Sequence, residues 1–151
     1  SFIEKSPAAI PTMLRYDTFY NKNSLYNTPP AFCIYMVGKV AAWIKRQGGL
    51  TAMAERNAKK ASLVYGAIDA SNGFYKGHAD KDSRSFMNVT FRLPNEELEK
   101  KFVAEALEHG LGGVKGHRSV GGMRTSIYNA MPYEGCVALT DFMEKFRKAN
   151  A

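Results

Sequence analysis

The 151-residue chain lacks the features that mark membrane and secreted proteins. It has no run of about 18 apolar residues, so it offers no candidate for a transmembrane helix. Its first residues do not form the hydrophobic core of a secretory signal. We therefore expect a cytoplasmic protein that has no membrane partner.

Cysteine and histidine are also scarce, with two and three residues respectively. Cys33 and Cys136 lie far apart without the spacing of metal ligands, and the histidines form no zinc pattern with them, so we expect no metal site. Both cysteines lie in apolar helical patterns. This predicts buried free thiols in a reducing compartment.

The net charge of +7 is compatible with nucleic-acid binding, but charge alone is weak evidence. The pairs Lys59-Lys60 and Lys100-Lys101 lie in helical patterns with acidic neighbours, which predicts solvated helix faces. The chain has no RNA-binding aromatic motif, zinc finger or basic zipper. We expect no nucleic-acid partner, and a nucleic-acid-binding module is the weaker alternative for function.

Hydrophobic periodicity predicts an α/β domain that follows an irregular lead-in over residues 1–22. Helices are expected at 31–47, 51–70, 95–110 and 132–148, and strands at 73–75, 86–93, 112–116 and 125–129. Residues 76–84 are expected to form a polar loop. Helices on one side of a small, mostly antiparallel sheet make a two-layer sandwich.

The helix expected at 31–47 has a broad apolar surface. Thr28 can cap this helix, with Pro29 at its first position. Its apolar residues form two adjoining stripes: Cys33, Val37, Val40 and Ile44 in one, and Phe32, Met36 and Trp43 in the other. A surface that broad predicts burial on more than one side, with Trp43 in a core.

Residues 115–124 (KGHRSVGGMR) concentrate the chemistry of anion binding. The guanidinium groups of Arg118 and Arg124 are donors that fit a carboxylate or phosphate in bidentate fashion, and His117 can add a hydrogen bond. The glycines of this stretch allow the backbone to wrap around a small anion. One interpretation is therefore a binding loop for a metabolite with one or two anionic groups. The other is a basic, glycine-rich turn with solvated arginines.

Asn27 and Thr28 precede the first long helix. Free N–H groups at a helix start, a side-chain amide and a hydroxyl can together bind an anion. The alternative is a helix cap beside a turn asparagine.

Both stretches resemble segments of the phosphoserine aminotransferase family. Residues 115–132 (KGHRSVGGMRTSIYNAMP) resemble its substrate-binding segment, and residues 23–30 (NSLYNTPP) resemble its segment for the cofactor phosphate. The two matches occur in the family's order and at about its spacing. The resemblance runs from about Pro11 to the end and covers only the C-terminal portion of that enzyme.

The resemblance implies the C-terminal small domain of a fold-type I pyridoxal-phosphate aminotransferase. Residues 1–30 would be a lead-in with the cofactor-phosphate segment, and residues 31–151 the small α/β domain with its long linking helix. The sequence departs from the family at 77–79, where the family often has a proline-valine pair. We expect that departure to lie in a surface loop.

The resemblance also implies roles for individual residues. Asn27 and Thr28 would bind the phosphate of pyridoxal phosphate in the neighbouring subunit's site, which implies a homodimer. Arg124 would bind the α-carboxylate of the amino acid. His117 and Arg118 would lie near the distal anion, either the phosphate of phosphoserine or the side-chain carboxylate of glutamate.

The implied reaction transfers an amino group between L-glutamate and 3-phosphohydroxypyruvate, with 2-oxoglutarate and phosphoserine as the counterparts, in serine biosynthesis. The family's cofactor-binding lysine and the acidic residue beneath the pyridine nitrogen both precede the equivalent of Ser1. We therefore expect no catalytic residue in this chain and no activity from it alone. The rival hypothesis is a non-enzymatic domain that uses residues 115–124 to bind anions.

Overall fold

The computed structural model describes residues 3–5, 7 and 9–151. The chain divides into two compact units, Ser1–Trp43 and Ile44–Ala151, which are considered separately below. The division into residues 1–30 and 31–151, which the family resemblance implies, describes domains of a longer enzyme. It stays a prediction.

The first unit contains a 3₁₀ turn, η1 (Thr12–Leu14), a short helix, α1 (Tyr16–Tyr20), and most of α2 (Ala31–Arg46). Helix α2 begins at Ala31, where the Ile34 N–H donates to the Pro30 carbonyl oxygen at 3.1 Å. The prediction that Thr28 caps α2 is therefore wrong. Thr28 and Pro29 each precede a proline, which disfavours the helical backbone and delays the start of the helix.

The predicted burial of α2 is also wrong. None of its residues is buried, Phe32 is 75% exposed, Trp43 is half-buried, and Cys33 is exposed rather than a buried thiol. An apolar helix is buried only when another layer packs against it. The described part of the first unit supplies no such layer.

The second unit is built on a three-stranded antiparallel sheet in the order β1-β2-β3. Its strands are β1 (Lys76–Gly77), β2 (Asn88–Arg92) and β3 (Met123–Ser126). The first strand begins later than predicted because the Ser71 hydroxyl accepts the Tyr75 N–H at 2.9 Å and so closes a turn over 71–75. The expected polar loop 76–84 thus contains β1 and a 3₁₀ turn, η2 (Lys81–Ser83). The strand expected at 112–116 is reduced to one bridge, between Lys115 and Met123.

Three helices complete this unit: α3 (Gly49–Asp69), α4 (Glu96–Glu108) and α5 (Tyr133–Asn150). Their predicted positions are confirmed to within two residues at each end. Asn95 caps α4, since its side-chain oxygen accepts the Leu98 N–H at 2.9 Å. Gly110, with φ of +75°, follows the end of α4.

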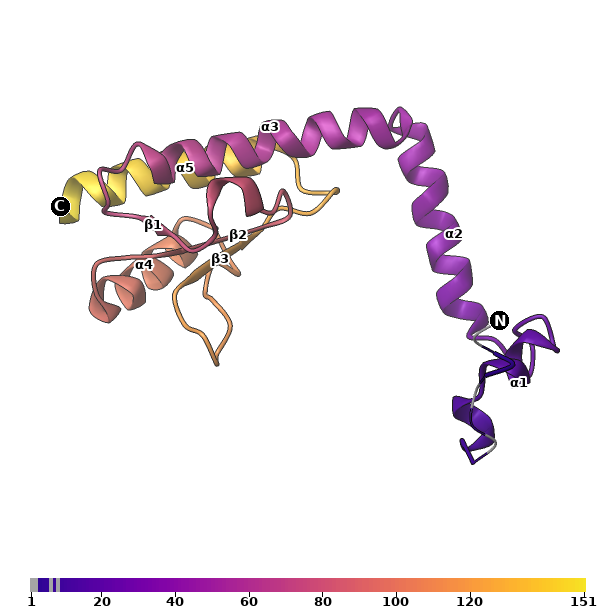
Figure 1. Ribbon diagram of the computed structural model, residues 1–151. Coiled ribbons are helices and arrows are strands. Elements are labelled where there is room, and N and C mark those ends of the chain that lie inside the picture. The colour runs from indigo at the N-terminus through magenta and orange to yellow at the C-terminus, as the bar shows by residue number, and fades with distance from the viewer. Residues whose placement is uncertain (1–2, 6, 8) are drawn as a thin grey trace. The chain divides into compact units, whose positions relative to one another are not determined.

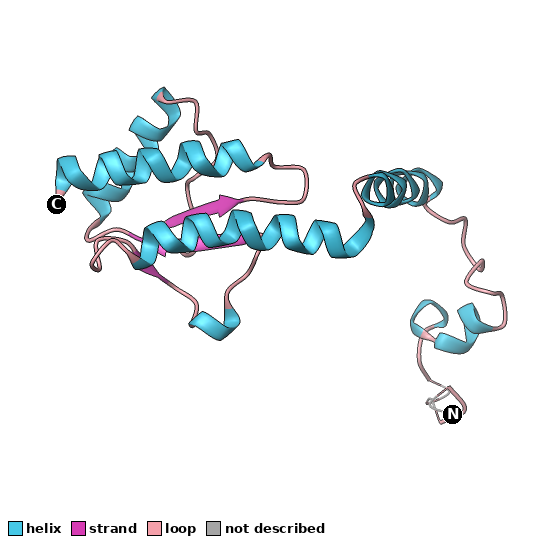
Figure 2. Cartoon of the chain, turned by 90° about the horizontal axis from the view of Figure 1, so that it is seen from above, coloured by secondary structure: helices cyan, strands magenta, loops and turns pink. Residues whose placement is uncertain are grey.

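Helices α3 and α5 lie side by side over one face of the sheet (Figures 1 and 2). Phe102 of α4 packs into the same core, with its ring 5.0 Å from Phe142 and 6.0 Å from Phe91. The predicted two-layer arrangement is therefore confirmed. The opposite face of the sheet is polar and carries Thr90, Arg92 and Arg124.

The prediction that Lys60 lies on a solvated face of α3 is wrong. Its side chain is fully buried, whereas Lys59, Lys100 and Lys101 are exposed as predicted. The Lys60 ammonium donates to three backbone carbonyl oxygens between β3 and α5: Ile127 at 3.1 Å, Tyr128 at 2.7 Å and Met131 at 3.1 Å. Burial lowers the pKa of Lys60, because removal from water disfavours the charged form.

Candidate functional site

The glycine-rich loop, residues 115–122, is closed by its own backbone. The Gly116 N–H donates to the Gly122 carbonyl oxygen at 2.8 Å, and the His117 carbonyl oxygen accepts the N–H groups of Val120 at 2.9 Å and Gly121 at 2.7 Å. A Cβ on Gly116 would lie 2.2 Å from the Gly121 carbonyl oxygen, so this position requires glycine. The predicted tight backbone is thus present, and it projects the side chains of residues 117–120.

His117 is exposed on this loop, and its ring is oriented by Ser119. The Nδ1 atom lies 2.7 Å from the Ser119 hydroxyl and accepts the Ser119 backbone N–H at 3.3 Å. Because Nδ1 accepts a hydrogen bond, we assign the proton of the neutral ring to Nε2. The Nε2–H group is then a donor available to an anion.

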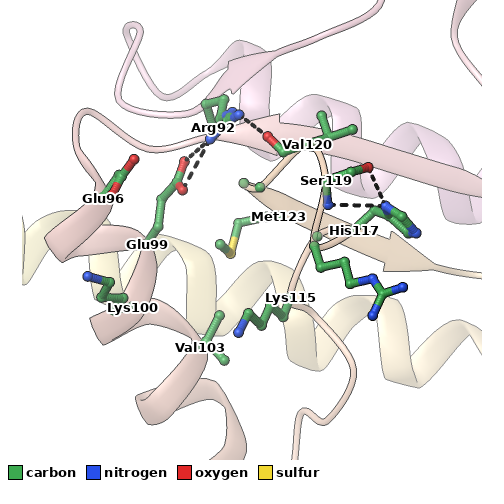
Figure 3. Close-up of a pocket in the computed structure, with 14 residues that line it drawn as sticks. Arg92, Glu96, Glu99, Lys100, Val103, Lys115, His117, Ser119, Val120 and Met123 are labelled. Carbon is green, nitrogen blue, oxygen red and sulfur yellow. Dashed lines mark hydrogen bonds and ion pairs between the residues drawn. The ribbon is translucent and has the colours of Figure 1, made fainter.

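Two cavities flank the glycine-rich loop. The loop–helix cleft, about 610 Å³ in volume, lies between the loop and α4, and both His117 and Arg118 line it (Figure 3). The loop–sheet pocket, about 130 Å³ in volume, lies against the polar face of the sheet, and His117 and Arg124 line it. The structure therefore brings all three predicted residues around one loop, with His117 common to both cavities.

The position of Arg124 follows from the alternation of side chains between the two faces of β3. Its neighbours Met123 and Thr125 are buried in the core, so the Arg124 side chain lies on the polar face, where Arg124 pairs with Thr90. Among residues 3–5, 7 and 9–151, neither Arg118 nor Arg124 has an acidic partner. Both guanidinium groups are thus available to an anionic ligand.

Arg92 also lines both cavities, although it is not among the residues that the sequence predicts for the site. The alternation of buried and exposed residues along β2 puts Arg92 on the polar face, and such alternation does not distinguish it from a solvated arginine. Its partners are Glu99 of α4, seven positions away, and Val120 of the glycine-rich loop, 28 positions away, and only the second is distant in sequence.

Asn27 and Thr28 belong to the first unit, where both are exposed just before α2. Within the described part of the chain, neither side chain has a hydrogen-bond partner. A side-chain amide and a hydroxyl next to a helix start form a donor set that suits a phosphate.

No group of three or more histidine, cysteine, aspartate or glutamate side chains that could hold a metal ion occurs in the described residues. The same residues include no helix that is long and apolar enough to span a membrane. Cys136 is buried, as predicted, and its burial raises the pKa of the thiol.

Comparison with known proteins supports the resemblance seen in the sequence. The model of the family "Aminotransferase class-V" matches residues 9–139. Phosphoserine aminotransferase from Niallia circulans is 60% identical over 148 residues, which cover 98% of this chain and 41% of that protein. The enzyme of the same name from Geobacillus kaustophilus (strain HTA426) is 60% identical over 149 residues, 99% of this chain and 41% of the relative.

Solved structures agree with these relatives. Phosphoserine aminotransferase from Bacillus circulans subsp. alkalophilus superposes with a TM-score of 0.88 and 59% identity, over 99% of this chain and 41% of that one. The PLP-bound phosphoserine aminotransferase from Trichomonas vaginalis gives a TM-score of 0.81 and 38% identity, over 91% and 39% of the two chains. The present chain thus spans about two fifths of the length of these relatives.

Proposed function

This chain belongs to the aminotransferase class-V family, and on that premise we propose that it is the C-terminal, substrate-binding portion of a phosphoserine aminotransferase. The complete enzyme would exchange an amino group between L-glutamate and 3-phosphohydroxypyruvate, as a cytoplasmic homodimer with pyridoxal phosphate. The observation that carries the proposal is the set of cationic donors around the glycine-rich loop. Arg118 and Arg124 are unpaired within the described residues, and His117 presents a ring N–H beside them.

The residues of this chain bind and orient the substrate. The Arg124 guanidinium binds the α-carboxylate that phosphoserine and glutamate share, through two parallel N–H donors. His117, through Nε2–H, and Arg118 bind the distal anion, which differs between the two substrates. The distance between these groups fixes which amino acids fit.

Asn27 and Thr28 hold the cofactor phosphate, since their side chains are exposed donors next to the start of α2. Pyridoxal phosphate, when bound, supplies the electron sink for the reaction. The lysine that holds it covalently comes from the remainder of the enzyme, so the isolated chain is inactive.

The test replaces Arg124 by lysine and His117 by alanine in the complete natural protein that carries this sequence. Arg124→Lys keeps the charge but loses the planar pair of donors, so both half-reactions should slow alike. His117→Ala should harm the reaction of phosphoserine more than that of glutamate, because a phosphate has more charge and more acceptor oxygens. The expected gap is roughly tenfold in kcat/KM, about 1–2 kcal/mol.

Each variant serves as the control for the other, because they alter opposite ends of the substrate. Equal losses in the His117 variant would show that this residue does not read the distal group. A selective loss in the Arg124 variant would mean that the two ends are assigned the wrong way round. Binding of phosphoserine by the natural protein without amino-group transfer would favour the rival anion-binding domain.

A further inference from the structure

We propose that Arg92 is a positioning residue that fixes the glycine-rich loop against α4, so that His117 and Arg118 face the distal anion. This inference rests on the proposed function for the identity of that anion. The position of the loop can be tested without any substrate.

The Arg92 guanidinium contacts two separate elements at once. Its Nη1 atom lies 3.4 Å from Oε2 and 3.5 Å from Oε1 of Glu99 on α4, and its Nη2 atom donates to the carbonyl oxygen of Val120 (Figure 3). Val120 belongs to the loop segment that bears His117 and Arg118. One side chain at the end of β2 therefore links this segment of the loop to the first turns of α4.

The loop backbone is shaped to accept the Arg92 side chain. A Cβ on Gly122 would lie 2.9 Å from the Arg92 Cδ atom, and a Cβ on Gly121 would lie 3.0 Å from its Nη1 atom. Both glycines have positive φ, +69° and +75°. Adjacent glycines thus allow the backbone to approach the guanidinium more closely than other residues would permit.

The contacts favour a positioning role over direct binding of the substrate. Glu99 is nearly buried, with 11% of its side chain exposed, so its carboxylate needs a cationic partner, and Arg92 supplies one. The paired Arg92 has less net charge to offer an anion than Arg118 or Arg124. Its geometric requirement is also specific, because two N–H groups must point to Glu99 and Val120 together.

Loss of Arg92 should therefore release the loop without removing any group that binds the substrate. The N–H groups of Val120 and Gly121 both donate to the His117 carbonyl oxygen, so their protection from solvent exchange reports the closed loop. His117 and Arg118 would still be present but no longer held in place. Arg124 should be affected less, because the pairing of β3 with β2 holds it independently.

The experiment compares Arg92→Gln, Arg92→Lys and Glu99→Gln in the complete natural protein, with Arg84→Gln as the matched control. Arg84 also forms a two-bond ion pair, with Asp69 at 2.6 and 2.8 Å, but it does not line either cavity. The first readout is amide hydrogen exchange of residues 116–122 in the absence of substrate. The second is the ratio of kcat/KM for phosphoserine to that for glutamate.

In the Arg92→Gln variant we expect loop exchange about tenfold faster, and a ratio of kcat/KM for phosphoserine to that for glutamate about tenfold lower. Arg92→Lys should not restore either value, since an ammonium group cannot replace the planar fork. Glu99→Gln should also speed loop exchange and lower the substrate ratio, but by less than Arg92→Gln does. The Arg84→Gln control should leave both values unchanged.

Unchanged exchange in Arg92→Gln would overturn the inference, and so would faster exchange with an unchanged substrate ratio. Rescue by lysine, or tighter phosphoserine binding in Glu99→Gln, would show that Arg92 binds the anion directly. If the natural protein does not act on phosphoserine, the proposed function fails. In that case unchanged loop exchange would still count against Arg92 as the residue that holds the loop.

Discussion

Replacing Lys60 by methionine removes a buried cation that has no carboxylate partner among the described residues. Methionine fills a similar volume but cannot donate to the carbonyl oxygens of Ile127, Tyr128 and Met131. The connection between β3 and α5 would lose three hydrogen bonds that tie it to α3, and the bond from the Asn57 side chain to Asn129 would remain. We expect the free energy of unfolding to fall.

The magnitude follows from the surroundings of each carbonyl group. The bond to Ile127 is buried, so its carbonyl oxygen would be left without a partner, at a cost of about 1–3 kcal/mol. Tyr128 and Met131 are 55% and 37% exposed, so water can replace the lost donor, and each loss costs about 0.5–1.5 kcal/mol. Removal of the buried charge offsets part of this total. A net loss of about 2–3 kcal/mol is expected.

The effect should depend on pH with a definite sign. Burial lowers the pKa of Lys60 in the folded chain below its ordinary value of 10.5, so the unfolded chain binds more protons between these two values. The contribution of Lys60 to stability therefore rises with pH through that window. Burial raises the pKa of Tyr65, Tyr75 and Cys136, which has the opposite effect. The contributions of Tyr65 and Tyr75 cancel when the variant is compared with the natural chain. That of Cys136 does not, because the Lys60 charge lowers the pKa of this thiol; its removal raises the thiol pKa further, which adds to the expected rise with pH.

Urea unfolding of the 151-residue chain, followed by far-ultraviolet circular dichroism at several pH values, measures both quantities. Lys59→Met is the matched control, because Lys59 is the exposed neighbour on the same helix. The reasoning is refuted if the free energies of unfolding of the Lys60 and Lys59 variants differ by less than about 0.5 kcal/mol. An increase in the Lys60 contribution as the pH falls would refute the linkage argument.

Two further substitutions test separate parts of the chain. Thr28→Ala in the complete protein should weaken pyridoxal-phosphate binding by about 1.5–3 kcal/mol, the cost of a hydrogen bond to a charged group. Its melting temperature without cofactor should not change, since α2 begins beyond Thr28; a loss of stability alone would restore the role of a helix cap. Gly116→Ala should open the glycine-rich loop and destabilise the protein by about 1–3 kcal/mol, because its Cβ would overlap the Gly121 carbonyl oxygen. Gly112→Ala, whose Cβ meets nothing within 4 Å, is the control in the same thermal-unfolding measurement, and equal effects would contradict the overlap.

The features that the sequence predicted correctly depend on local signals. Asn95 before acidic residues marks the start of α4, and the alternation around Val89 marks β2. The glycine-rich loop was recognisable because its glycines and cations are adjacent in the sequence. Each of these signals is complete within a few residues.

The features that were missed depend on contacts distant in sequence. Lys60 bonds carbonyl groups 67 to 71 positions away, and Arg92 bonds one 28 positions away. A lysine in a helical charge pattern cannot be told from a solvated one before those partners are placed. The burial expected for α2 failed for a related reason, since its apolar pattern shows a need for partners but not where they lie.

The closure of the glycine-rich loop between Gly116 and Gly122 gives the site a modular character. The side chains of residues 117–120 can change while β3, and with it Arg124, keeps its register against β2. Position 121 must remain glycine, because a Cβ there would lie 3.0 Å from the Arg92 Nη1 atom. In the proposed function, recognition of the group common to all amino acids is thus separated from recognition of the group that distinguishes them. In the proposed enzyme, substitution of residues 117–120 would alter which amino-acid side chain is accepted without changing the contact between Arg124 and the α-carboxylate.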